Sequence, residues 1–141
     1  QQHRPDLIYV PEWLRHPNRV TGICAVNILA ADDFHTPLRK RLTAVYGAAR
    51  PVEGGFEVQT ANGVFRVMTP TAFASEIGPL PAVVTLDHTP CIAGMDLRMS
   101  DPATMKGFLE GSKMGYRAHK TGFALTEPER TANTILRFIA E

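Results

Sequence analysis

Apolar and polar residues follow the same order twice along the chain. In the first half, residues 20–30 are apolar and partly β-branched, which is typical of a strand. Leu38, Leu42 and Val45 then recur at helical spacing, after two aspartates (Asp32 and Asp33) that predict a helix start. Three short strands follow, at 49–53, 56–60 and 64–69, separated by Gly54-Gly55 and Asn62-Gly63, which are typical of hairpin turns. The first half therefore predicts the order β-α-β-β-β.

The second half repeats this order after a proline-rich stretch at 70–90. Residues 91–99 predict a strand, and Ser100-Asp101-Pro102 predicts the start of a helix that closes at Gly115. Three more strands are expected, at 116–120, 122–126 and 133–140. The stretch 70–90 reads as a long connection, with residues 82–86 as an extra short strand. Because residues 23–32 align with residues 91–101, one supersecondary unit is used twice.

This repeat predicts an α+β fold. Two tandem βαβββ modules would form a concave mixed sheet with the helices on its outer face. Three prolines (Pro5, Pro11 and Pro17) predict an extended N-terminal arm over residues 1–19. The domain itself would span 20–141, with module one at about 20–70, a connection at about 70–90 and module two at about 91–141.

Composition narrows the classes of function. The 141 residues carry a formal net charge of +1, which gives no support to a nucleic-acid-binding protein. No apolar run approaches the roughly 18 residues that indicate a membrane span, so no membrane partner is expected. Two cysteines, Cys24 and Cys91, cannot form a disulfide framework, which favours reduced thiols and a cytoplasmic location.

Three short segments carry a resemblance to a known family. They are Trp13-Leu14-Arg15-His16-Pro17-Asn18, Val67-Met68-Thr69-Pro70 and Ile135-Leu136-Arg137-Phe138. Together with the double βαβββ order, they resemble the vicinal oxygen chelate superfamily, home of glyoxalase I, extradiol dioxygenases and bleomycin-resistance proteins, and in particular glyoxalase-like proteins of bacteria. The resemblance implies a divalent metal inside the concave sheet, held by His or Gln, Glu, His and Glu from the first and fourth strands of each module.

The metal positions of that family fall on residues that cannot bind a cation. They correspond to Ala25 or a close neighbour, Arg66, Gly94 and Arg137. Two of these are fixed cations, and a slip of one residue brings in Cys24 or Asn27 but no set of His and carboxylates. We therefore expect no metal site and no cofactor.

Strand alternation predicts which side chains face the cavity. Val26, Ile28, Phe65, Val67, Met95, Leu97, Leu136 and Phe138 are expected to pack under the helices. The polar side chains expected in the cavity are Asn27, Arg66, Asp96, Arg98 and Arg137. Three arginines against one aspartate predict a positive concavity suited to a carboxylate or phosphate. The alternative reading is an internal ion pair, with arginines that extend into solvent and bind nothing.

The sequence identifies no catalytic residue. His88 and His119 are the histidines placed to reach the cavity, whereas Cys24 and Cys91 are expected to be small core residues. Three hypotheses stay open: a metal-independent domain that binds a small anionic molecule, a lyase or isomerase whose catalytic centre lies in another module, and a non-catalytic dimerisation module. As partners, the sequence allows a second copy of the chain or a preceding module of a longer one.

Overall fold

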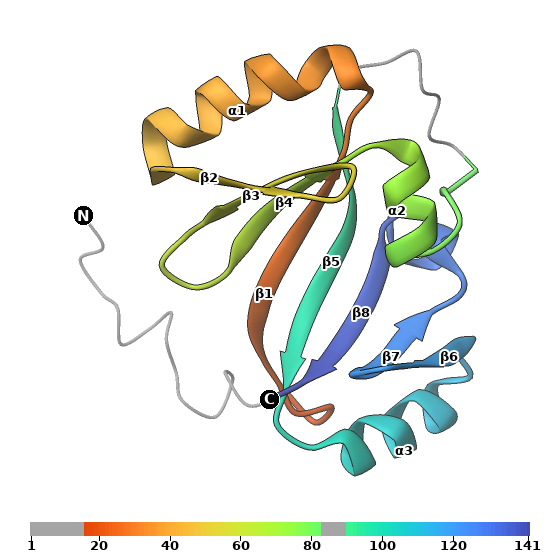
Figure 1. The fold of residues 1–141 in the computed structure, drawn as a ribbon. Coiled ribbons are helices and arrows are strands. Elements are labelled where there is room, and N and C mark those ends of the chain that lie inside the picture. Colours follow the sequence, from red (N-terminus) through yellow and green to blue (C-terminus); the bar gives the residue numbers. More distant parts are fainter. Residues whose placement is uncertain (1–15, 83–89) are drawn as a thin grey trace, which may run out of the picture.

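The computed structural model describes residues 16–82 and 90–141, which form one eight-stranded sheet with helices packed against it (Figure 1). The first module comprises β1 (Val20–Leu29), α1 (Asp32–Tyr46), β2 (Ala49–Val52), β3 (Gly55–Gln59) and β4 (Val64–Met68). The second comprises β5 (Cys91–Met99), α3 (Pro102–Ser112), β6 (Tyr116–His119), β7 (Gly122–Leu125), the 3₁₀ turn η2 (Pro128–Thr131) and β8 (Ile135–Ala140). Both predicted βαβββ modules are confirmed.

The two modules join through their first strands. The strand order is β2-β3-β4-β1-β5-β8-β7-β6, with β1 antiparallel to β5. In each module the first strand also pairs in parallel with the last, β1 with β4 and β5 with β8. The four central strands are therefore the first and last of each module, as the repeat predicts.

Two helices cover the outer face at opposite ends of the sheet (Figure 1). Phe34 and Leu38 of α1 pack on Phe56 and Val58, whereas Met105 and Leu109 of α3 pack on Phe138 and its neighbours. Asp101 caps α3 as predicted, since its carboxylate accepts hydrogen bonds from the backbone N–H groups of residues 103 and 104.

Two predicted helix boundaries are wrong. Asp32 and Asp33 lie in the first turn of α1 rather than at its N-cap, which is Ala31. There the acidic side chains favour the N-terminal end through the helix dipole instead of through a capping bond. The helix α3 ends at Ser112, with Lys113 in the left-handed conformation, before Gly115 is reached.

A third helix replaces part of the predicted connection at 70–90. The helix α2 (Pro70–Glu76) starts after Thr69, whose hydroxyl accepts a hydrogen bond from the backbone N–H of Ala72 at 3.3 Å. Phe73 and Ile77 are fully buried in a cluster with concave-face residues such as Leu29. Because Leu29 and Asn27 share one face of β1, α2 fills one end of the concavity.

The outer-face core is less buried than the alternation predicted. Of the eight residues expected there, Val67 and Phe138 are buried and the other six are half-buried. The reason is that α1 and α3 cover the ends of the sheet, while the best-buried cluster on the central strands lies under α2, on the opposite face.

Several sequence predictions fall outside the described residues. They concern residues 1–15 of the arm, residues 83–86 of the extra strand, and His88. Within the described part of the chain, none of the helices has the length and apolar character needed to cross a membrane.

Candidate functional site

Four of the five predicted cavity residues meet at the centre of the concave face. Asn27 stands opposite Arg66 in the β1–β4 pairing, and Asp96 stands opposite Arg137 in the β5–β8 pairing. The Asn27 amide nitrogen donates to Asp96 Oδ1 at 3.1 Å, and Arg66 Nη1 donates to Asn27 Oδ1 at 3.3 Å. The two modules thus place equivalent residues side by side, a polar residue on the first strand and an arginine on the last.

Arg137 and Asp96 form a bidentate ion pair. Arg137 Nε lies 2.7 Å from Asp96 Oδ1, and Nη2 lies 2.6 Å from Oδ2. Both residues are buried, at 3% and 5% exposure, and Asn27 is fully buried. Every buried side-chain nitrogen and oxygen of the described residues has a hydrogen-bond partner. These three side chains are therefore a satisfied internal network.

Two carboxylates that the sequence reasoning missed complete this network. Glu57, opposite Arg66 in the β3–β4 pairing, accepts from Arg66 Nε at 2.7 Å and from Arg50. Glu76, at the end of α2, places Oε1 3.2 Å from Arg66 Nη1. Three carboxylates rather than one thus lie among the arginines, and most of the expected positive surplus at the centre is neutralised. Strand alternation is enough to place Glu57 on the same face as Arg66. No pattern in the sequence indicates Glu76, because residues 70–90 predict a connection rather than a helix.

Protonation states at the centre follow from these pairs. Although burial alone would raise the pKa of Glu57, the hydrogen bonds from Arg66 and Arg50 outweigh it and hold that pKa below its ordinary value. Burial likewise disfavours the charged form of Arg66, but its carboxylate neighbours raise the pKa of its guanidinium above the ordinary value. Glu57 and Arg66 therefore form an ionised pair at neutral pH.

The residues at the centre do not fit a metal ion. Arg66 and Arg137 occupy the last-strand positions, where the resemblance implies glutamates, and Asn27 and Asp96 stand beside them. Within residues 16–82 and 90–141, no group of three or more His, Cys, Asp or Glu side chains is placed to hold a metal. Guanidinium groups repel cations, so this arrangement disfavours a bound metal ion.

Arg98 lies apart from this network, in a groove at the open end of the concave face. The groove measures about 590 Å³ and is lined by residues 21–23 of β1, residues 59 and 61–63 around the β3–β4 turn, and Arg98. Among the residues that the structure describes, no carboxylate lies within 4 Å of the Arg98 guanidinium. Arg98 is exposed and is the single charged residue in that lining.

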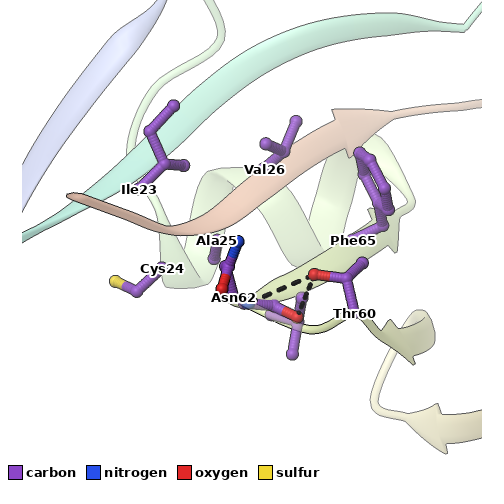
Figure 2. Close-up of a pocket in the computed structure, with 9 residues that line it drawn as sticks. Ile23, Cys24, Ala25, Val26, Thr60, Asn62 and Phe65 are labelled. Atoms are coloured by element: carbon purple, nitrogen blue, oxygen red, sulfur yellow. Dashed lines mark hydrogen bonds between the residues drawn. The ribbon is translucent and has the colours of Figure 1, made fainter. Parts of the chain in front are cut away.

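A smaller notch of about 170 Å³ adjoins this groove, lined by residues 23–26 of β1 and by residues 60 and 62–65 around the β3–β4 turn (Figure 2). The Thr60 hydroxyl closes the turn, since it donates to the Gly63 carbonyl at 2.8 Å and accepts from the Gly63 N–H at 3.1 Å. Gly63 must be glycine because a Cβ there would lie 2.4 Å from the carbonyl oxygen of Cys24. The glycine lets the turn approach β1 closely and shapes both hollows.

The described histidines and cysteines do not assemble a nucleophile. His119 lies on the edge strand β6, contacts Thr121 Oγ1 at 3.2 Å, and has its pKa lowered by burial and by Arg137. Burial raises the pKa of both thiols, and the Cys24 thiol donates to the Asp96 carbonyl at 3.3 Å. Both cysteines are half-buried, and neither thiol is activated by its surroundings.

Comparison with known proteins identifies the fold. No protein-family profile and no curated protein matches the sequence. Among solved structures, the methylmalonyl-CoA epimerase of Mycobacterium tuberculosis superposes with a TM-score of 0.54 at 16% identity, over 89% of this chain and 91% of the epimerase. The Streptomyces coelicolor methylmalonyl-CoA epimerase, in a variant bound to 2-nitronate-propionyl-CoA, gives 0.52 at 14% identity, over 86% and 98%.

These superpositions define a class. The chain has the glyoxalase-like fold of the vicinal oxygen chelate type, as the repeat and the resemblance predicted. At 14–16% identity the likeness concerns the fold alone.

Proposed function

We propose that the domain binds a small anionic molecule, a carboxylate or phosphate, in the groove at the open end of its concave face and without a metal ion. The observation that carries this proposal is Arg98. Of the three arginines expected in the cavity, it is the one with no carboxylate neighbour among the described residues. An exposed guanidinium in a groove can offer two parallel N–H donors to a ligand.

Asn27, Arg66, Asp96 and Arg137 have a supporting role in this proposal. Asn27, Asp96 and Arg137 are buried, with their hydrogen bonds made inside the protein. Asp96 and Arg98 stand two residues apart on one face of β5, about 7 Å from one another along the strand. The buried network therefore fixes the strand that carries Arg98.

The structural neighbours support the class of ligand. The Streptomyces coelicolor epimerase holds 2-nitronate-propionyl-CoA, a molecule with several acidic groups. The step from a shared fold to a shared class of ligand is an analogy. An anionic small molecule is therefore the first class of ligand to test on this chain.

A thermal-shift and calorimetric titration with small carboxylates and inorganic phosphate tests the proposal. We expect an anion to raise the melting temperature of the wild-type protein. Loss of one bidentate contact weakens binding by roughly 1.5–3 kcal/mol, so Arg98→Met should bind about tenfold more weakly or worse. Arg41→Met, an exposed arginine on α1, removes the same charge from the outer face and serves as the matched control.

A second candidate, a structural module without a ligand, is favoured by the filled end of the concavity. There α2 covers the face and the ion pairs are complete. If no anion shifts the melting temperature, or if Arg98→Met and Arg41→Met lose the shift equally, this second candidate replaces the first.

A further inference from the structure

Three arginines from three strands converge on the C-terminal end of α2. Arg137 Nη1 donates to the Glu76 carbonyl at 3.1 Å, and Arg117 Nη2 donates to the Ile77 carbonyl at 2.8 Å. Arg66 Nη1 lies 3.2 Å from the Glu76 carboxylate. Two carbonyl oxygens and one carboxylate thus stand where guanidinium donors from both modules point.

This arrangement differs from an ordinary helix end. The last turn of α2 contains no basic residue, and its acidic Glu76 lies at the end where the carbonyls already carry partial negative charge. A carboxylate there is unfavourable for the helix itself, and the arginines of the sheet offset it. The C-terminal end of α2 therefore presents to these arginines the kind of negative charge that a bound anion would present.

The Glu76 carboxylate is the exchangeable part of this contact. Its side chain is 52% exposed, whereas the side chain of Arg66 is 17% exposed and that of Glu57 is 10% exposed. Rotation of the Glu76 side chain into solvent would free one N–H of Arg66 Nη1, while the other stays on Asn27 Oδ1. Phe73 and Ile77, which anchor α2 in the core, need not move.

We propose that Glu76 is an internal counter-ion on Arg66 that a carboxylate of the ligand replaces. The inference rests on the proposed function and adds a second anion position to it. Arg66 contacts Asp96, with Nη1 3.7 Å from Oδ2, and Arg98 lies two residues further along the same face of β5. A ligand that occupied both positions would need two carboxylates, so a small dicarboxylate is the class to test.

Calorimetric titration of malonate, succinate and acetate into the wild type and Glu76→Gln tests this inference. Without the internal competitor, Glu76→Gln should bind the dicarboxylates about fivefold more tightly, the ratio expected for loss of a partly exposed ion pair. Glu53→Gln is the matched control, because Glu53 is exposed and lines, together with Glu76, a hollow of about 380 Å³ beside α2. This substitution removes the same charge. It should leave the affinity unchanged.

Arg66→Lys in the Glu76→Gln background is the second variant. It keeps the charge that Glu57 needs but removes the planar fork, so the gain in affinity should disappear while the protein stays folded.

The outcomes separate this inference from the proposed function. Equal affinities of Glu76→Gln and the wild type, an equal gain in Glu53→Gln, or a gain that survives Arg66→Lys would overturn the role of Glu76. If Arg98→Met still weakens binding about tenfold or more in that case, the proposed function stands alone. If neither a carboxylate nor inorganic phosphate binds any variant, both proposals are refuted.

Discussion

Replacing Arg137 by methionine leaves Asp96 as a buried carboxylate without its bidentate partner, because the remaining cation, Arg66, stands 3.7 Å away. Arg137 makes two hydrogen bonds to that carboxylate, at 2.7 and 2.6 Å, and a third to the Glu76 carbonyl at 3.1 Å. Methionine keeps much of the length and volume of the stem, so the loss is electrostatic rather than a cavity. Removal of one partner from a buried pair destabilises by roughly 3–5 kcal/mol. We expect a loss in this range for Arg137→Met.

Urea and thermal unfolding, followed by circular dichroism at pH 7, measure this loss. For a chain of this size, roughly 3 °C per kcal/mol predicts a fall in melting temperature of about 10–15 °C. Arg98→Met is the control, because Arg98 is exposed and has no carboxylate partner among the described residues. Its free energy of unfolding should change by about 0.5 kcal/mol or less.

A double variant isolates the buried charge as the cause. Asp96→Asn removes the carboxylate, and in the Arg137→Met background it should recover part of the lost stability because no charge is left unpaired. A loss below about 1 kcal/mol in Arg137→Met, or no recovery in the double variant, would show that water reaches Asp96 and that the pair is not a buried one.

Three further outcomes are expected. The pKa of Glu57 is lowered in the folded state, so its contribution to stability is present above its unfolded pKa of about 4.3 and is lost as the pH falls below that value. The free energy of unfolding of Glu57→Gln should therefore fall less on acidification than that of the wild type. Gly55→Ala should lower the melting temperature, since a Cβ would lie 1.9 Å from the Val67 carbonyl oxygen, whereas Gly107→Ala in α3, with open space, should stabilise by about 0.5–1 kcal/mol. Elemental analysis should find no stoichiometric transition metal, and a chelator should leave the melting temperature unchanged.

The fold could be predicted because its signals are local and occur twice. Alternation, hairpin turns and the Asp101-Pro102 helix start each constrain one element, and repetition fixes their order. The same alternation placed Asn27, Arg66, Asp96 and Arg137 on one face, where the structure brings them together. The central part of the site was therefore within reach of the sequence.

The missed helix carried a signal that the prolines obscured. Thr69-Pro70 is the same type of helix start as Asp101-Pro102, a capping side chain followed by proline at the first helical position. Phe73 and Ile77 after it have helical spacing and are fully buried. No local pattern, however, indicates that this short helix packs on the concave face, because that depends on long-range contacts with β1 and β4.

The charge of the cavity could not be obtained from the arginines alone, because a buried guanidinium requires a carboxylate within reach. Arg66 meets that requirement through Glu57, directly opposite on β3, and Arg137 meets it through Asp96, directly opposite on β5. Arg98 stands opposite Ile139 on β8 and stays exposed, so water can solvate it in place of a carboxylate. Burial thus decides which arginine needs a carboxylate partner inside the protein, and the opposite residue in the sheet register is the first position at which to look for that partner.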